Sequence, residues 1–209
     1  MLDKVEWLGH SSIKILGSKI IYIDPYGLKE GFYDADIIFI THSHYDHFSP
    51  EDIKKCQKAS TKIIIPNDLS QDVLKLGFQE KNIVKVFPDE RYEVAELNFM
   101  TIPAYNVGKE YHPKTNGWVG YVIDMDGVRY YIAGDTDITN EAKEVKCDVA
   151  FLPIGGTFTM DYQEAATLAN EIRPKVVVPI HYGSLVGTEE DALNFKSKIE
   201  DRVECKILK

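Results

Sequence analysis

The sequence predicts a layered α/β domain, because short apolar runs alternate with amphipathic segments that begin at helix caps. Near-continuous apolar runs at 149–153 and 176–180 are typical of strands buried on both faces. Residues 120–135 are expected to form a hairpin, since Asp126-Gly127 supplies the positive φ of a tight turn. Other runs, rich in β-branched and aromatic residues, predict strands at 19–24, 36–41, 62–66, 83–87, 97–103 and 203–208.

Three helices are predicted from their first turns, which begin at Ser49, Asp161 and Thr188. Ser49 precedes a first-turn proline, and each of the other two caps has an acid three residues later, as in a capping box. The second helix is expected to end near Ile172 and the third near Asp201. Helices between strands of this kind predict sheets covered by helices.

Length and composition indicate one globular domain over residues 1–209. Hydrophobic residues make up 44% of the chain and charged residues 27%, which is the globular range. The formal net charge of −9 disfavours binding to phosphate backbones, so nucleic acid is not the expected partner. We expect a small-molecule substrate instead, and leave open whether the chain forms a homo-oligomer.

The sequence also predicts a cytoplasmic protein without a membrane partner. No apolar run approaches the ~20 residues that span a bilayer, and the first residues lack the pattern of a secretory signal. The three cysteines, Cys56, Cys147 and Cys205, are scattered and form no CxxC pair. They are interpreted as reduced thiols that are neither disulfide-bonded nor zinc ligands.

The strongest chemical signal is the run His42-Ser43-His44-Tyr45-Asp46-His47, which lies between a predicted strand and a predicted helix. In an extended segment alternate side chains point the same way, so His42, His44 and Asp46 are expected to share a direction while His47 points elsewhere. Imidazole and carboxylate ligands suit zinc, manganese or iron. The alternative is a polar loop whose histidines are only hydrogen-bonded.

Three further polar residues follow apolar strands directly. Asp135 follows 129–134 and His181 follows 176–180, at the strand ends where open α/β sheets place ligands. A carboxylate such as Asp135 can bridge two metal ions. Asp24, after the run KIIYI, is interpreted as a residue that orients a ligand or the histidine loop. The alternatives are a turn residue for each aspartate and a core histidine for His181.

The motif THSHYDH at 41–47 resembles the HxHxDH signature of the metallo-β-lactamase superfamily. Other segments resemble the branch that contains ascorbate phosphate lactonase and small metal-dependent hydrolases: GHSS at 9–12, AGDTD at 133–137, PIGGTFTM at 153–160 and PIHYG at 179–183. The resemblance runs from about Trp7 to Gly187. It implies a four-layer αββα sandwich with a binuclear metal centre at one edge of the two sheets.

Carried over to this sequence, the resemblance implies one or two divalent metal ions, with zinc first and manganese, iron or nickel as alternatives. The first ion would be bound by His42 and His44, and the second by Asp46, His47 and His181, with Asp135 as the bridge. His10, in GHSS, would lie near the metals or be a hydrogen-bonded core histidine.

The sequence departs from the superfamily at the third motif, where a histidine normally completes the first site. Asn106 stands in that place, in the run Ile-Pro-Ala-Tyr-Asn, and His112 follows shortly after. Asn106 could complete the site through its amide oxygen, or His112 could do so from a loop. The alternative for His112 is a solvated loop histidine. We predict that it faces the metal centre, as a ligand or as a group that contacts substrate or water.

These residues predict a metal-dependent hydrolase that uses a metal-activated water on a small ester, lactone, amide or phosphodiester. Asp46 is predicted to orient the water besides binding metal, and His112 to take part in catalysis. Two alternatives are a nucleic-acid-processing phosphodiesterase and a non-catalytic module that binds a metal or ligand.

Overall fold

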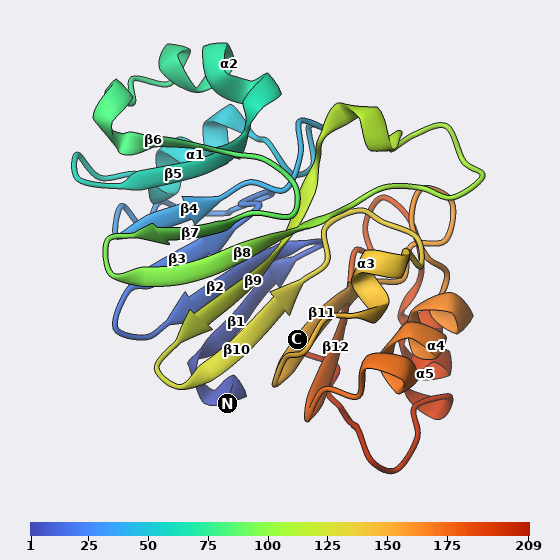
Figure 1. The fold of residues 1–209 in the computed structure, drawn as a ribbon. Coiled ribbons are helices and arrows are strands. Elements are labelled where there is room, and N and C mark those ends of the chain that lie inside the picture. Colours follow the sequence, from blue (N-terminus) through green and yellow to red (C-terminus); the bar gives the residue numbers. More distant parts are fainter. The chain divides into compact units, whose positions relative to one another are not determined.

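Two β-sheets organise the chain in the computed structural model, which describes residues 1–209 (Figure 1). Each sheet belongs to one of two compact units, Met1–Phe87 and Pro88–Lys209. The predicted α/β class is confirmed, since both units combine strands with helices. The single domain expected over 1–209 stays a prediction.

The first unit contains a six-stranded sheet in sequence order. Its strands are β1 (Val5–Gly9), β2 (Ser12–Leu16), β3 (Ile20–Ile23), β4 (Ile37–Phe39), β5 (Lys62–Pro66) and β6 (Ile83–Val86). The pairings of β1 with β2 and of β2 with β3 are antiparallel, and the later three are parallel. The parallel strands therefore end at a common edge, where loops can bring polar groups together.

Two helices cover this sheet, α1 (Pro50–Cys56) and α2 (Ser70–Lys75). Side chains of both helices, Ile53 and Val73, share a buried cluster with Tyr22, Ile38 and Ile63 of the strands. Short 3-10 turns occur at Leu2–Lys4, Asn67–Leu69 and Glu80–Asn82. The rigid strands and α1 fix both ends of the loop that carries the histidine run.

The second unit contains a seven-stranded sheet in the order β13-β12-β11-β10-β9-β8-β7. Its strands are β7 (Arg91–Val94), β8 (Leu97–Pro103), β9 (Val119–Met125), β10 (Val128–Ile132), β11 (Val149–Pro153), β12 (Val176–Ile180) and β13 (Glu204–Cys205). Strands β7 to β10 pair antiparallel, and β10 to β13 pair parallel. The carboxyl ends of β10 and β12, on either side of β11, consequently lie at the same edge.

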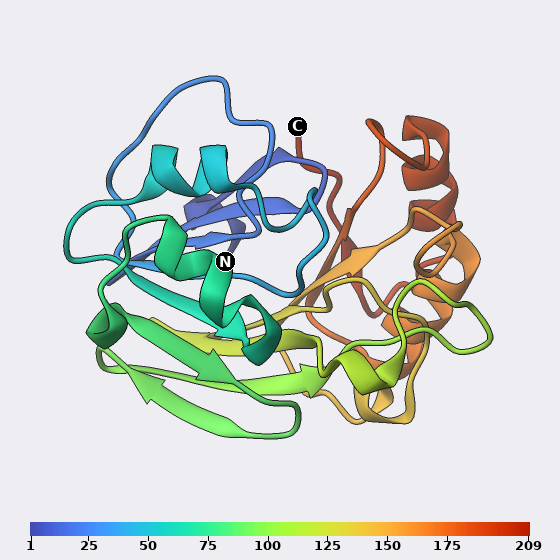
Figure 2. The same ribbon diagram turned by 90° about the horizontal axis from the view of Figure 1, so that it is seen from above.

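The helices of the second unit are α3 (Asn140–Lys143), α4 (Tyr162–Ile172) and α5 (Glu189–Ser197), and a 3-10 turn spans Lys114–Asn116. Helix α4 contacts β11 and α5, and Figure 2 shows α4 and α5 next to each other in orange and red. None of the helices in either unit is both long and apolar enough to cross a membrane.

The predicted helix starts are confirmed by their caps. The Ser49 hydroxyl accepts the Asp52 N–H, and Asp161 and Thr188 both begin capping boxes. The predictions were less accurate at the carboxyl terminus. Helix α5 ends at Ser197 rather than near residue 201, and the last strand is only the two-residue β13.

The carboxylate of Asp52, on α1, anchors the loop that joins β3 to β4. It accepts the N–H groups of Gly27 (2.9 Å) and Leu28 (3.1 Å), and it binds the Lys55 ammonium (3.0 Å). Burial raises the pKa of this carboxyl, but hydrogen bonds from Ser49, Lys55 and Gly27 outweigh burial and hold the pKa below its usual value. The ionised form is therefore the one that the fold stabilises.

Replacing Asp52 by Asn should lower the free energy of unfolding by about 1–3 kcal/mol at pH 7, since charge-assisted bonds become neutral ones. Because the folded pKa is depressed, this stabilisation is present above the unfolded pKa of about 3.9 and is lost as pH falls through the folded value. Urea unfolding at pH 7 and below pH 4 should show the difference from wild type shrinking in acid. The matched control is Glu30→Gln, an exposed acid of the same loop. A constant difference at both pH values would contradict the assignment.

Candidate metal centre

The histidine loop, residues 41–48, turns instead of running extended from β4 to α1. The N–H groups of His47 and Phe48 both donate to the carbonyl of His44, at 3.0 and 2.7 Å. This turn ends the strand-like alternation after His44. The expectation that Asp46 shares the direction of His42 and His44 therefore rested on a backbone shape that the loop does not adopt.

The imidazoles of the loop nevertheless lie together. Nε2 of His42 is 3.1 Å from Nδ1 of His44, and the ring centroids of His42 and His47 are 4.0 Å apart. His42 and His47 are buried, while His44 is half-buried. The structure thus brings the ring nitrogens of His42 and His44 together, and their binding of one ion stays a prediction.

The Asp24 carboxylate holds this loop in place. Asp24 directly follows β3, has a φ of 44° and is fully buried. Its oxygens accept the Thr41 N–H (2.8 Å) and the Thr41 hydroxyl (2.6 Å), and one lies 2.7 Å from Nδ1 of His47. A carboxylate at Nδ1 fixes the tautomer and leaves Nε2 as the nitrogen that would bind a metal. This geometry agrees with the predicted orienting role of Asp24.

His10 contacts Asp46, the carboxylate of the histidine run. It lies in the turn between β1 and β2 with a φ of 50°, and its carbonyl accepts the Trp7 indole N–H at 2.9 Å. Nε2 of His10 is 3.0 Å from Oδ2 of Asp46, and that oxygen is 3.6 Å from Nε2 of His47. His10 is thus both a buried histidine and a neighbour of a predicted ligand.

In the second unit, Asp135 lies between two histidines. One of its oxygens, Oδ2, is 3.1 Å from Nε2 of His181 and 3.3 Å from Nε2 of His112. Asp135 follows β10, and His181 follows β12 with a φ of 58°. The common edge of the parallel strands brings Asp135 and His181 together, as the sequence predicted. Two imidazole nitrogens and a carboxylate oxygen this close form a donor set that suits zinc, manganese or iron.

Asn106 holds His112 in this arrangement. Its amide oxygen accepts the His112 backbone N–H (3.0 Å) and is also 3.0 Å from Nδ1 of the ring, while its amide nitrogen donates to the Phe158 carbonyl (2.9 Å). His112 is only 1% exposed and packs against the Trp118 ring, so the solvated-loop alternative is wrong. Because the amide oxygen is engaged with His112, the geometry favours His112 over Asn106 at the third motif.

Two carboxylates fasten the loop that carries His112, and sequence reasoning missed both. Asp137 accepts the Val107 N–H (2.8 Å) and the Lys109 ammonium (2.7 Å). Glu141, at the start of α3, binds the Lys114 ammonium at 2.6 Å. The second acid of the AGDTD motif was the available signal for Asp137, whereas nothing near Glu141 distinguishes it from an ordinary helix acid.

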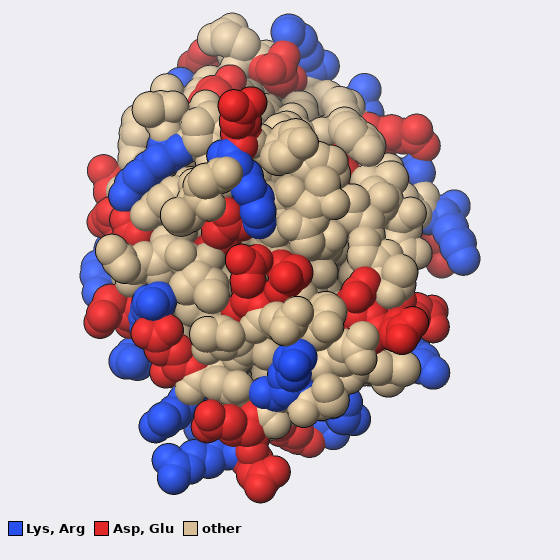
Figure 3. All heavy atoms as spheres, turned by 90° about the vertical axis from the view of Figure 1, so that its right-hand side faces the viewer, with Lys and Arg blue, Asp and Glu red and all other residues tan.

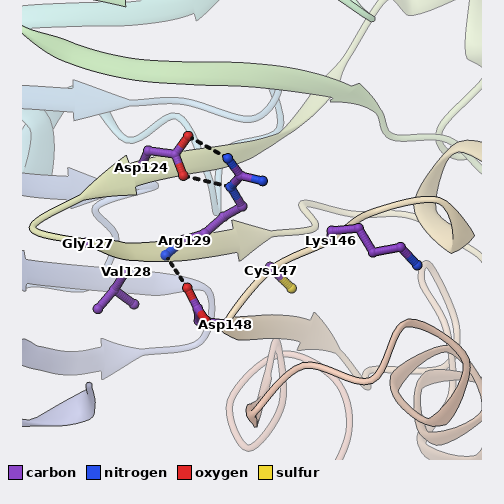
Figure 4. Close-up of a pocket in the computed structure, with 7 residues that line it drawn as sticks. All are labelled: Asp124, Gly127, Val128, Arg129, Lys146, Cys147 and Asp148. Carbon is purple, nitrogen blue, oxygen red and sulfur yellow. Dashed lines mark hydrogen bonds and ion pairs between the residues drawn. The ribbon is translucent and has the colours of Figure 1, made fainter.

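A cavity of about 530 Å³ in the second unit lies apart from these donors (Figure 4). Asp124 binds the Arg129 guanidinium through two oxygens, Asp148 accepts the Arg129 N–H, and the Lys146 side chain extends away from them. Burial raises the pKa of Cys147 to about 12, so its thiol is not a nucleophile at neutral pH. None of the predicted ligands lines this cavity, and its Arg129 guanidinium is already paired with Asp124.

Known proteins that are similar to this chain include metal-dependent hydrolases, which agrees with a set of metal-binding side chains. Residues 4–181 match the model of a family described as the beta-lactamase superfamily domain. The chain belongs to the metallo-β-lactamase superfamily. A metal-dependent hydrolase from Thermococcus onnurineus is 32% identical over 218 residues, which cover 99% of this chain and 96% of that relative.

Solved structures of related proteins have the same fold as this chain. One is the crystal structure of a protein from Parabacteroides distasonis that is described as a metal-dependent hydrolase. Its TM-score to this chain is 0.84 at 31% sequence identity, and the match covers 98% of this chain and 93% of that protein's chain. Igni18, a metallo hydrolase from Ignicoccus hospitalis, has a TM-score of 0.79 and 26% identity, with coverages of 98% and 94%. The predicted metallo-β-lactamase-like fold and hydrolase class are confirmed, while the resemblance to ascorbate phosphate lactonase stays a prediction.

Proposed function

We propose that this superfamily member hydrolyses a small ester, lactone, amide or phosphodiester at a binuclear centre of divalent metal ions, with zinc as the first choice. The observation that supports it most is the position of Asp135, whose Oδ2 faces Nε2 of both His112 and His181. Manganese, iron and nickel remain alternatives, because the same imidazole and carboxylate donors suit them.

The proposed ligands are those that the sequence resemblance implies. They are His42, His44, Asp46, His47, Asp135 and His181, with His112 completing the set in place of the usual third-motif histidine. The donors fit a catalytic rather than a structural ion: imidazoles and carboxylates without thiolates are typical of sites that keep a position for water. A bound divalent metal would supply a Lewis acid that lowers the pKa of water to about 7.

Hydrogen bonds within the chain would position the attacking water and the metal-binding imidazoles. Asp46, fixed by the 3.0 Å contact with His10, would accept a hydrogen bond from the attacking water and orient it. Asp24 would fix the ring of His47, and Asn106 that of His112. These contacts would position ligands before a substrate arrives.

Charge supports a small-molecule substrate over the alternative of a nucleic-acid phosphodiesterase. The net charge is −9, and the face in Figure 3 shows acidic and basic side chains interspersed rather than a continuous basic band. The names of the relatives favour an enzyme over the non-catalytic alternative. A cytoplasmic location, the absence of a membrane partner and the oligomeric state stay predictions.

The ligand set predicts the metal content of variants. Purified wild-type protein loaded with zinc and dialysed should retain one or two ions per chain, and both His42→Ala and Asp135→Ala should retain sharply less, since each change removes a donor. Asp124→Ala, which removes a carboxylate that binds Arg129 instead, is the matched control and should retain as much zinc as wild type. Elemental analysis checks the outcome. Unchanged zinc in both ligand variants would overturn the assignment.

His112→Ala should reduce turnover by about 10–100-fold once a substrate is found, while zinc at Asp46, His47, Asp135 and His181 is mostly retained. The reason is that the buried His112 imidazole lies 3.3 Å from the Asp135 carboxylate, which is itself a predicted ligand. Steady-state kinetics together with zinc content would test this. Glu110→Gln, an exposed acid of the same loop, is the control. Wild-type turnover in His112→Ala would show that the imidazole has no part in catalysis.

A further inference from the structure

A loop of the second unit, residues 104–118, carries His112, whose Nε2 lies 3.3 Å from the Asp135 carboxylate. The loop closes on itself where the Asn106 N–H donates to the His112 carbonyl at 2.8 Å and the Asn106 amide oxygen accepts the His112 N–H at 3.0 Å. Residues 107–111, between these two positions, form neither helix nor strand. These hydrogen bonds join His112 to its own loop, but they do not join the loop to the segment that carries Asp135.

Asp137 makes the connection between the loop and that segment. Its backbone N–H donates to the Tyr105 carbonyl at 3.0 Å. Its carboxylate accepts the Val107 N–H at 2.8 Å through Oδ2 and binds the Lys109 ammonium at 2.7 Å through Oδ1. One residue thus holds the loop at three positions, through its backbone and through both carboxylate oxygens.

The burial of Asp137 makes these contacts specific. The residue is 5% exposed, and each of its oxygens has a separate donor. A buried carboxylate is costly unless donors satisfy it, so another arrangement of residues 107–109 would leave a buried charge without its donors. Asp135 lies two residues before Asp137 on the segment that follows β10. The contacts of Asp137 therefore also set where His112 lies relative to Asp135.

We propose that Asp137 is a positioning residue, which holds the His112 imidazole against the Asp135 carboxylate so that the two can bind one metal ion. This inference rests on the proposed function and adds a residue to which it gives no role. Asp137 does not bind the ion itself, because both of its oxygens are occupied by donors of the loop. It acts through His112, by way of Val107 and Lys109.

Two measurements test this role, and the first needs no metal. In metal-free protein, Asp137→Ala should shift and broaden the ring signals of His112 in a proton–carbon NMR spectrum, because the imidazole loses its fixed position. Asp148→Ala is the matched control, since Asp148 also accepts a backbone N–H (Arg129, 2.9 Å) and binds an ammonium (Lys175, 2.8 Å). Asp148 lines the cavity that lies apart from the predicted ligands, so the control should leave the His112 signals at their wild-type positions.

The second measurement is the affinity for zinc, determined by competition with a chromophoric chelator. Asp137→Ala should weaken zinc binding by about 10–100-fold, which is the usual cost of removing a group that holds a metal ligand. Asp148→Ala should bind zinc as the wild type does. Asp137→Asn should lose less affinity than the alanine variant, because its amide oxygen can still accept the Val107 N–H. The asparagine variant also serves as the test if the alanine variant does not fold.

Either wild-type His112 signals or wild-type zinc affinity in both Asp137 variants would overturn the inference and leave the metal-dependent function intact. Equal changes in Asp148→Ala would also overturn it, because the effect would then not be specific to Asp137. If the wild-type protein binds no zinc, the proposed function fails, and the NMR comparison still decides whether Asp137 positions His112.

Discussion

The buried carboxylate of Asp24 is the interaction on which the histidine loop depends. It takes hydrogen bonds from both the backbone and the side chain of Thr41, and it faces the ring of His47. A buried donor left without an acceptor costs about 1–3 kcal/mol, so the three contacts together define one arrangement of the loop. Because the loop starts at Thr41, the positions of His42 and His44 follow from the same carboxylate. In the second unit, Asn106 gives His112 a comparable support.

Backbone strain accompanies these contacts. His10, Asp24 and His181 all have φ between 44° and 58°, a region that residues other than glycine seldom adopt. Such a conformation costs of order 1 kcal/mol or more and persists where surrounding contacts determine it. Each of the three residues turns the chain sharply at a strand end or hairpin, which directs its side chain toward other polar groups. Three of the residues that hold or form the candidate centre therefore carry backbone strain.

The core strands and the helix caps could be predicted from sequence because their signals are local. The runs at β5, β8, β11 and β12 match the observed bounds, and so does the Asp161 capping box. The hairpin of β1 and β2 was not predicted, because its turn uses a left-handed His10 rather than a common turn pair. Helix α2 begins at Ser70 and its N-cap residue, Leu69, makes no side-chain cap hydrogen bond, so no sequence signal marked its start.

In the candidate site too, some features have a local sequence signal and others do not. Strand ends placed Asp135 with His181, because parallel strands share an edge whatever the rotamers are. The contact of His10 with Asp46 could not be predicted, since it joins residues 36 positions apart through side-chain direction alone. Similarly, Asn106 was considered as a ligand because sequence shows its oxygen but not that His112 occupies it. The sequence therefore predicts which residues carry the chemistry, whereas the hydrogen bonds that hold those residues depend on the three-dimensional structure.

The central claim is that these imidazoles and carboxylates bind catalytic metal ions. The most direct test is a crystal structure of the zinc-loaded protein with anomalous data collected on both sides of the zinc absorption edge. We expect anomalous peaks about 2.0–2.2 Å from the ring nitrogens of His42, His44, His47 and His181 and from an Asp135 oxygen. A zinc-saturated crystal with no peak at these atoms would contradict the account.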